Sequence, residues 1–378
     1  MKSATFLLLL ILGLSSYAQS QSDKTGDNRF RIKKGSFYGF IDHDGVVKID
    51  PVYSAANYFS DGLASVKEAG ASKSFYIDVD GKPAFKGSFD IAGKFEEGRA
   101  VVKDGGKYGV IDKDGNWISK PMYKNIYTFS ERFSFYQTDS LYGVMDYDGN
   151  QITPAIFKSV SGFQEGLAKV VLNKKQCFID TTGTVIIEHQ FNTTYSFQEG
   201  LAEVRGDIRN PSRKGKYGFI NKTGELVIDT IYDDVADFSH GVTIGVKKDT
   251  VYLINNSGII IKRYDQFYDY DDLTEGMGIV LKEDTTEDGD DLAGVIDSTG
   301  KLILEPIYAE VSAYSEGFAF AEDAESEKYA LVDDKGHFIT KFIYDDVDDF
   351  EDGLAEVEMA HKKCYINTKG IIVWKDEK

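Results

Sequence analysis

The stretch that organises this chain is Lys107-Tyr108-Gly109-Val110-Ile111-Asp112-Lys113-Asp114-Gly115. It reads as an aromatic residue, a glycine, two apolar residues, Asp or Asn, two variable residues and a second glycine. This second glycine, the turn glycine, recurs at Gly45, Gly81, Gly115, Gly149, Gly183, Gly224, Gly258, Gly300, Gly336 and Gly370. Its commonest spacing is 34 residues. Self-similarity at a period of this size indicates a repeat architecture, in which each unit packs on its neighbours.

The residue three positions before each turn glycine is always acidic or its amide. The ten residues are Asp42, Asp78, Asp112, Asp146, Asp180, Asn221, Asn255, Asp297, Asp333 and Asn367. Asp or Asn at the start of a turn accepts a hydrogen bond from the backbone N–H two residues on, and glycine adopts positive φ at no steric cost. The pattern therefore predicts a hairpin with a type I turn and a glycine bulge, as between residues 217–220 and 225–228.

A second motif, which we call the marker, follows each of the first nine turns. It reads F-x-[ED]-G-L-A-x-V in its clearest copies, residues 163–170 and 350–357. The marker glycine stands 17 residues after the turn glycine in eight of nine copies, with Arg132 replacing glycine in the third. Leu-Ala-x-Val is typical of a strand. Each unit is thus predicted to hold three short strands, one before the turn, one after it and one in the marker.

We therefore expect an all-β protein of about ten three-stranded antiparallel units that form a curved β-solenoid or superhelix. The alternative is a closed propeller-like ring, in which a stray strand at residues 30–32 completes the last unit. We rank the ring second because propeller blades usually have four strands and about 40 or more residues.

The repeat resembles the bacterial WG repeat, also called KWG. The Trp of the Trp-Gly pair is Tyr here, at Tyr38, Tyr108, Tyr142 and Tyr217. The pair is degraded in four units, at Ser74-Phe75, Gln176-Cys177, Val251-Tyr252 and Lys363-Cys364. The resemblance covers about residue 30 to the end. It implies an all-β array that is usually exported or at the cell envelope, with binding roles and no established general activity.

The N-terminal segment has the features of a secretory signal. Lys2 precedes an apolar run, residues 4–14, and small residues stand at Ser16 and Ala18 around a cleavage site. We divide the chain into a signal peptide (1–18), a polar, disordered lead-in (19–28) and a repeat domain (29–378). Export would place the protein in the periplasm, at the cell surface or outside the cell, with no membrane insertion after signal removal.

Charge disfavours two classes of partner. The formal charge is −19, so nucleic acid and anionic lipid surfaces would be repelled. The five histidines have no metal-ligand spacing, and no catalytic or cofactor motif is present. We therefore expect no catalytic, cofactor or metal residue. D-x-D-G, as at residues 112–115, resembles the start of a calcium loop, but its glycine comes too early and hairpin chemistry explains it better.

Two further groups of residues, the acidic runs and the cysteines, could in principle carry chemistry. The acidic runs at residues 232–237 and 344–349 offer paired carboxylates of the kind that glycosidases use, but they are also typical of solvated loops. Cys177 and Cys364 occupy one repeat position, where most copies have a small residue, and we expect free buried thiols.

Insertions between repeats indicate the binding face. They fall in one loop, between the marker strand and the next unit's first strand, at residues 67–73, 205–214, 283–291 and 322–327. One loop carries a basic group, namely Arg205, Arg209, Arg213, Lys214 and Lys216, and another an acidic group at residues 283–291. We expect a non-enzymatic binding or scaffold protein with a protein or anionic glycan partner. The alternative is a cell-envelope enzyme, most plausibly a carbohydrate hydrolase with clustered carboxylates.

Overall fold

The computed structural model describes residues 29–188, 190–283 and 291–376. The expected signal peptide, the whole lead-in and most of the acidic loop therefore lie outside the described residues. The elements in chain order are β1 (Phe30–Lys34), β2 (Phe37–Ile41), β3 (Val47–Ala56), β4 (Leu63–Glu68), β5 (Phe75–Asp78), β6 (Ile91–Glu96), β7 (Arg99–Asp104), β8 (Lys107–Asp112), β9 (Trp117–Tyr123), β10 (Asn125–Ile126), β11 (Phe133–Thr138), β12 (Leu141–Asp146), β13 (Ser159–Val160), β14 (Leu167–Leu172), β15 (Lys175–Asp180), β16 (Val185–Ile187), β17 (Phe191–Gln198), β18 (Leu201–Asp207), the 3₁₀ helix η1 (Pro211–Arg213), β19 (Tyr217–Asn221), β20 (Leu226–Tyr232), β21 (Asp234–Val235), β22 (Val242–Val246), β23 (Val251–Asn255), β24 (Ile260–Tyr264), β25 (Asp269–Thr274), β26 (Met277–Lys282), β27 (Leu292–Asp297), β28 (Leu302–Tyr308), β29 (Glu310–Val311), β30 (Phe318–Asp323), β31 (Lys328–Asp333), β32 (Asp346–Val347), β33 (Leu354–Met359), β34 (Lys362–Asn367) and β35 (Ile372–Lys375).

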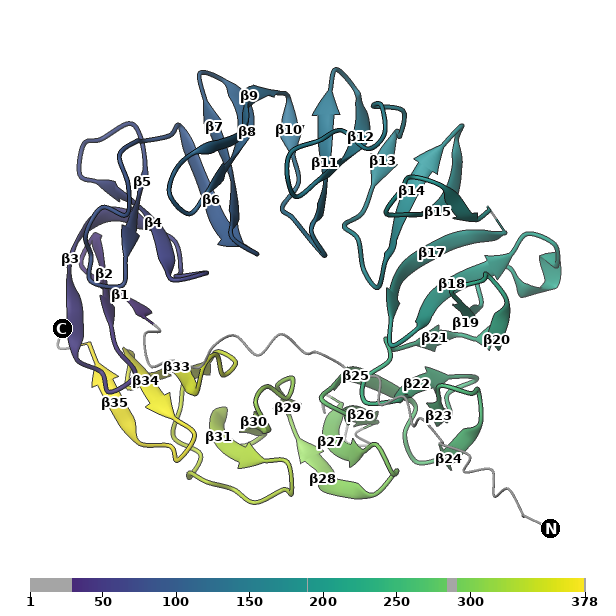
Figure 1. Ribbon diagram of the computed structural model, residues 1–378. Helices are drawn as coiled ribbons and strands as arrows, with labels where there is room; N and C mark the ends of the chain where they lie inside the picture. The colour runs from purple at the N-terminus through teal and green to yellow at the C-terminus, as the bar shows by residue number, and fades with distance from the viewer. Residues whose placement is uncertain (1–28, 189, 284–290, 377–378) are drawn as a thin grey trace, which may run out of the picture.

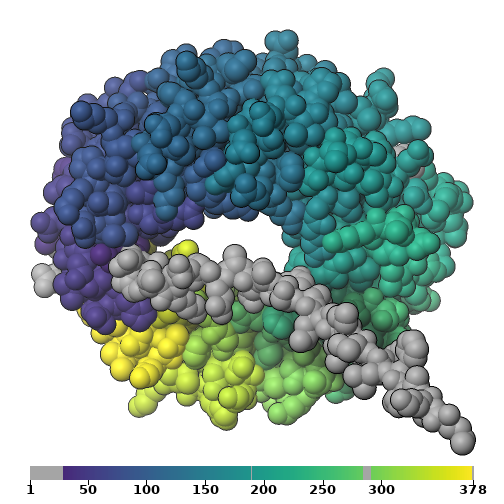
Figure 2. Space-filling view, in the orientation of Figure 1, coloured from purple at the N-terminus to yellow at the C-terminus, as the bar shows by residue number. Residues whose placement is uncertain are grey.

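The strands form a closed β-propeller. Over the described residues they make nine antiparallel sheets, most of them four-stranded, each in simple sequential order. The sheets stand in a ring around a central channel (Figures 1 and 2). The expected curved solenoid of three-stranded units is therefore wrong, and the ring that we ranked second is the architecture. The period is short for a propeller because the hairpin turns are tight and, in five of the sheets, one strand is very short.

That short strand is the one that sequence reasoning missed. It precedes the marker and pairs with the marker strand, as β21 pairs with β22 (Val235↔Gly245). In five sheets it has only two residues: β10, β13, β21, β29 and β32. We call it the inner strand, since β21 and β25 lie beside the channel while β24 and β28 lie at the rim (Figure 1). Two residues carry no detectable alternation, so this part of the chain reads as loop.

The blade is also offset from the sequence repeat. Within one sheet the marker strand of one unit pairs with the first strand of the next, as β18 pairs with β19 (Val204↔Gly218). The order from channel to rim is therefore inner strand, marker strand, Tyr-Gly strand and outer strand. The loops that carry the insertions are hairpins inside blades, not connections between them.

The first sheet contains two repeat units. Its middle strand β3 pairs with β2 through Ile49 and with β4 through Ala56. The unit that begins at β1 has no inner strand among the described residues. The expectation that residues 30–32 complete the last unit is also wrong, because β1 pairs with β2 and the last sheet is made of β32–β35.

Packing closes the ring without a shared strand. Phe30, Ile32 and Ile41 form one buried cluster with Leu354 and Tyr365 of the last sheet. The Tyr365 hydroxyl donates a hydrogen bond to the Arg31 carbonyl oxygen over 2.9 Å. The first and last units thus meet through apolar burial, the same force that packs every other pair of neighbouring sheets.

The hairpin prediction is confirmed. Asp112 Oδ1 accepts hydrogen bonds from the N–H groups of Asp114 (3.0 Å) and Asn116 (2.8 Å). Gly115 has φ +79° and donates its N–H to the Asp112 carbonyl oxygen over 3.0 Å. The equivalent Asp or Asn side chain makes the same two bonds in the other nine turns. Turn chemistry therefore accounts for D-x-D-G without a cation.

The glycine of the Tyr-Gly pair is required for a different reason, which is the close approach of a neighbouring strand. At Gly218 an added Cβ would lie 2.4 Å from the Ile228 carbonyl oxygen, because the outer strand crosses directly over this position. Cys177 and Cys364 stand at the same repeat position, and both are buried free thiols, as predicted. Burial raises the pKa of both thiols.

The acidic residue of the marker joins neighbouring blades. The carboxylate of Glu131 accepts hydrogen bonds from the backbone N–H groups of Glu165 (2.6 Å) and Gly166 (2.7 Å) in the next marker turn. We call this contact the marker clasp. Equivalent clasps are Asp61 to Gly98, Glu97 to Arg132, Glu165 to Gly200, Glu199 to His240 and Gly241, Glu275 to Glu316 and Gly317, and Glu316 to Gly353. Marker turns are therefore hydrogen-bonded to their neighbours around most of the ring; between the sixth and seventh markers the Gly276 N–H donates to the Ser239 hydroxyl over 3.0 Å instead.

Candidate functional site

The basic loop, residues 205–216, connects β18 to β19. Asn210 begins the short helix η1, and its side-chain oxygen accepts the Ser212 N–H over 3.3 Å. This loop is the hairpin between marker strand and Tyr-Gly strand. The longer loops at residues 67–73 and 322–327 are the same hairpin in other blades, so all three project from one face of the ring. Most of the 283–291 loop is outside the described residues.

Acidic neighbours neutralise much of the basic loop. Arg209 makes a two-pronged contact with the Asp207 carboxylate, with N–O distances of 2.9 and 3.1 Å. This hydrogen bonding holds the pKa of Asp207 below its usual value. Arg209 also donates to the Gln190 side-chain oxygen over 3.0 Å. A paired guanidinium of this kind is a poor receptor for a second anion.

The other predicted cations have separate partners. Arg213 donates to the Asp229 carboxylate over 2.7 Å, and Lys216 pairs with the Asp233 carboxylate. The guanidinium of Arg205 lies 5.1 Å from the centre of the Tyr217 ring. Only Lys214 of the five lacks a side-chain partner within the described chain. The structure thus keeps the five residues on one hairpin but does not gather their charges into one anion site.

A carboxyl group that sequence reasoning missed lies between β18 and the next inner strand. Burial raises the pKa of Glu203 to about 8, and the charges of Asp237 and Asp234 add to the shift. Burial also raises the pKa of Asp234 and of Asp237, which belong to the acidic run 232–237. Asp234 and Asp237 keep contact with solvent although protein surrounds them. No motif around Glu203 signals this, because its neighbours belong to another repeat.

All three carboxyl groups shift in the same direction. A glycosidase needs one carboxyl with a raised pKa and a second that stays ionised, so their environments must push the two pKa values apart. Here burial raises the pKa of every member, and the charges of Asp237 and Asp234 add to the shift of Glu203. The three carboxyl groups therefore do not separate an acid from a nucleophile or base.

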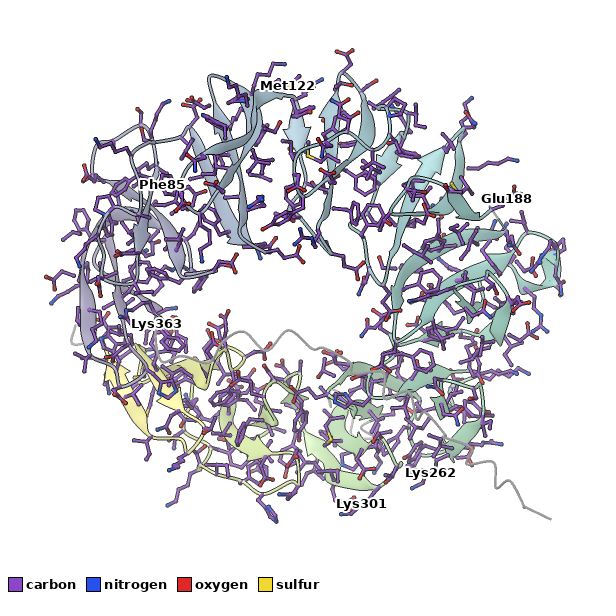
Figure 3. All side chains as sticks on the ribbon, viewed as in Figure 1. Phe85, Met122, Glu188, Lys262, Lys301 and Lys363 are labelled. Atoms are coloured by element: carbon purple, nitrogen blue, oxygen red, sulfur yellow. The ribbon has the colours of Figure 1, made fainter. Side chains whose placement is uncertain are left out.

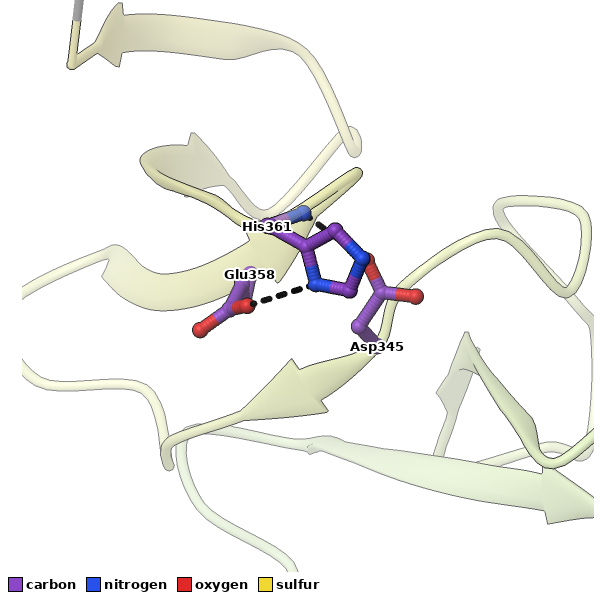
Figure 4. A group of neighbouring side chains, drawn as sticks. All are labelled: Asp345, Glu358 and His361. Carbon is purple, nitrogen blue, oxygen red and sulfur yellow. Dashed lines mark hydrogen bonds and ion pairs between the residues drawn. The ribbon is translucent and has the colours of Figure 1, made fainter. Parts of the chain in front are cut away.

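The second acidic run, 344–349, contributes to a group of possible metal ligands. Ligand atoms of Asp345, Glu358 and His361 lie within 4.8 Å of one another (Figure 4). Asp345, however, pairs with the Lys328 ammonium, and His361 Nδ1 is 3.7 Å from Glu358. In another blade Asp233 likewise pairs with Lys216 and accepts the Lys248 N–H over 3.0 Å, without a histidine. The aspartate is therefore a repeated structural residue.

A cavity of about 290 Å³ lies at the seam between the first and last units. Phe30, Tyr58 and Tyr365 line its apolar part, and Asp348 and Asp352 line its acidic part. An adjoining hollow of about 320 Å³ is bordered by Arg31 and Glu356. Sequence reasoning could not find this cavity, because its walls come from residues more than 300 positions apart.

The outer strands expose large apolar side chains around the rim. The most exposed are Ile259 (62%), Met122 (61%), Ile307 (59%) and Ile371 (56%). Met122 lies on the outer side of the ring in Figure 3. Single exposed apolar side chains on separate blades are ordinary for a protein surface and do not by themselves mark a contact site.

Comparison with known proteins identifies the repeat. A family model described as WG containing repeat matches residues 38–70, 75–108, 108–141, 142–175, 178–205, 217–252, 294–323 and 329–362, more than half of the chain. No curated protein matches the chain by sequence.

Solved structures share the fold at low sequence identity. The crystal structure of a eukaryotic initiation factor has a TM-score of 0.50 and 9% identity, covering 93% of this chain and 96% of that one. BamB from Moraxella catarrhalis has a TM-score of 0.33 and 11% identity over 73% and 90% of the two chains. AztD from Citrobacter koseri has 0.36 and 11% over 85% and 92%. At 9% sequence identity, the similarity to the initiation factor shows a shared fold and nothing further.

Proposed function

The chain belongs to the WG repeat family, and from this we propose that it is an exported, non-enzymatic binding or scaffold protein. Its ligand is a protein held on the face of the propeller that carries the extended hairpins. The observation that carries the proposal is the common position of those hairpins. Loops that extend from one face of a rigid scaffold are where binding residues concentrate.

The charge pattern favours a protein over an anionic glycan. Asp207, Asp229 and Asp233 already pair with cations of the basic loop. A sulfated or carboxylated glycan would have to displace these carboxylates. A protein surface with both charges and apolar groups matches the loop, whose polar groups are satisfied and whose Ile208 side chain is exposed.

A carbohydrate hydrolase is less well supported. Its best candidate acid is Glu203, with a pKa of about 8. The neighbouring Asp234 and Asp237 have their pKa values raised by burial as well, so the site offers no carboxyl of opposite character. A binding role uses the regular ring directly and needs no single catalytic constellation.

Export rests on the sequence of residues 1–18. Among the described residues, no helix combines the length and the apolar character needed to span a bilayer. We propose cleavage after Ala18, which would give a mature protein that starts at Gln19 and acts in the periplasm or beyond.

The test is a pull-down from the native envelope fraction with a shortened basic loop. Residues 207–215 are replaced by the Asn-Lys pair that closes the β14–β15 hairpin at residues 173–174, which restores the standard spacing. We expect an unchanged melting temperature and at least about tenfold weaker capture of the partner, since hot-spot residues each cost more than about 1 kcal/mol.

The matched control shortens another hairpin on the same face. Deleting Glu325 and Ser326 from the β30–β31 hairpin brings that spacing to the standard value. This variant should fold and capture the partner as the parent does. Equal capture by all three proteins would reject the basic loop as the binding site.

A further inference from the structure

Within the part of the chain that the structure describes, the first repeat unit has a strand edge without a partner strand. In later blades the inner strand pairs with the marker strand, as β17 pairs with β18 through Thr194↔Val204. β1 occupies the place of a marker strand, because Ile32 is opposite Gly39 as Val204 is opposite Gly218. Within the described residues β1 pairs only with β2. Its other edge faces the seam cavity, whose wall includes Phe30.

The groups on this edge are those that bind the inner strand elsewhere. In other blades the carbonyl equivalent to that of Arg31 accepts an inner-strand N–H, as Lys169 accepts from Ser161 over 2.8 Å. The Arg31 carbonyl instead accepts the Tyr365 hydroxyl, which leaves its second lone pair available. An open edge beside a cavity is the geometry for addition of one extended strand.

Among the described residues the marker clasps are interrupted at this seam, as they also are between the sixth and seventh markers, where the Gly276 N–H donates to the Ser239 hydroxyl over 3.0 Å. Asp352 holds the acidic position of the last marker, yet its carboxylate accepts no backbone N–H within the described part of the chain. On the other side, the described residues supply no carboxylate for the Gly62 N–H, although the equivalent Gly98 binds Asp61 over 2.6 Å. One further marker turn between these two ends would supply the clasps that are missing at the seam.

The sequence just before β1 has the spacing and the acidic residue of a marker turn, with Thr25 in place of the motif's Phe. Asn28 stands 17 residues before Gly45, the standard distance from marker glycine to turn glycine. Asp27 then holds the acidic position, and Asn is one of the residues that tolerate the positive φ of the glycine position.

Side-chain sizes support the same alignment. In the marker the inner-strand residue is large and its partner is small, as in the pairs Phe197↔Ala202 and Phe95↔Ala100. The equivalent positions of the first unit hold Thr25 and Phe30 in the sequence, so the large residue stands at the marker-strand position. Phe30 is buried against Tyr365, with ring centres 5.8 Å apart.

We propose that residues 21–28 of this chain are the occupant of the open β1 edge, added as the missing inner strand. Asp352 would then clasp the backbone at Asp27 and Asn28, and Asp27 would clasp Gly62. This assignment replaces the disordered lead-in that composition alone favours. It does not depend on the proposed binding function.

A disulfide cross-link tests the register. In the sheet of β17 and β18, Thr193 is opposite Arg205. The residues at the equivalent sequence positions of the first unit are Gln21 and Lys33. The variant with Gln21→Cys and Lys33→Cys should form an intramolecular disulfide under mild oxidation, because directly paired strand residues lie within disulfide reach. The matched control, Ser22→Cys with Lys33→Cys, is shifted by one residue and should cross-link at least tenfold more slowly. Mass spectrometry of peptides reads out both.

A second measurement covers variants that fold poorly. Hydrogen exchange of the Arg31 and Lys33 amides in the parental chain should show protection independent of protein concentration. Replacing residues 19–26 by a Gly-Ser sequence of equal length should raise their exchange rates at least tenfold. Equal cross-linking in both cysteine variants would overturn the proposal. So would an intermolecular disulfide, which marks a second copy, or protection that appears only with an added partner peptide.

Discussion

The turn glycine shows how one residue type serves two demands. Gly224 has φ +83°, a conformation that branched side chains resist. An added Cβ would also lie 2.9 Å from a methyl carbon of Ile187 in the preceding blade. Backbone strain and blade packing therefore both select glycine at this position.

We predict that Gly224→Val lowers the free energy of unfolding by about 1–3 kcal/mol, since a β-branched residue is forced to positive φ. Urea denaturation of the purified protein measures the change. Asn221→Asp is the control, because Asp accepts the same turn hydrogen bonds in other copies. It should cost less than about 1 kcal/mol, even though the Asn221 amide donates to Glu225 over 3.0 Å. Equal stability of the valine variant and the parent would contradict the turn assignment.

At the scale of elements, the inner strands are too short to be stable alone. β13 has two residues and pairs with the marker strand β14. The clasp from Glu131 to the turn that joins these strands fixes its position against the preceding blade. The clasp therefore supplies order that two residues of strand cannot.

We predict that Glu131→Ala lowers the free energy of unfolding by about 1 kcal/mol, because two backbone N–H groups lose a charged acceptor at an exposed site. Glu131→Gln keeps one acceptor oxygen and should have an intermediate effect. Glu305→Ala is the control, since Glu305 is exposed and makes no contact of this kind within the described chain. Chemical denaturation compares the three. A Glu131→Ala variant as stable as Glu305→Ala would show that the clasp contributes nothing.

At the scale of the molecule, the seam is the place where the ring depends on side chains alone. β1 and β35 belong to different sheets and share no backbone pairing. The Tyr365 hydroxyl bond to Arg31 and the cluster around Phe30 hold the first and last units together. Opening of the ring should therefore begin here.

We predict that Tyr365→Phe raises hydrogen-exchange rates in β1 and β35 by about two- to tenfold, the loss expected for one hydrogen bond of about 0.5–1.5 kcal/mol. Exchange in β14 and β15 should not change. Tyr76→Phe is the matched control, because the Tyr76 hydroxyl donates to the Gly93 carbonyl oxygen over 2.6 Å inside the continuous part of the ring. Its effect should stay near β6. Faster exchange around the whole ring in Tyr365→Phe would contradict the special role of the seam.

Local chemistry was readable from the sequence alone. The Asp-x-x-Gly turns, the all-β class, the repeat period, the marker and the buried thiols of Cys177 and Cys364 depend on residues close in the chain or on one repeat position. Backbone preferences of Asp and Gly act over four residues, so no tertiary information is needed. The position of the basic loop as an insertion after the marker strand was also readable from the sequence, whereas its hairpin within one sheet was not.

Only the tertiary structure decided the rest, because it depends on residues distant in sequence. The two-residue inner strands form only because they pair with the marker strands. Closure of the ring depends on the rotation between neighbouring blades, which the sequence of one repeat does not indicate. Pairing of Arg213 with Asp229 removed charge from the loop that the sequence singled out. Burial between blades raised the pKa of Glu203 to about 8. The seam cavity arose where Phe30 meets Tyr365, since closing a ring brings together the two ends of a chain.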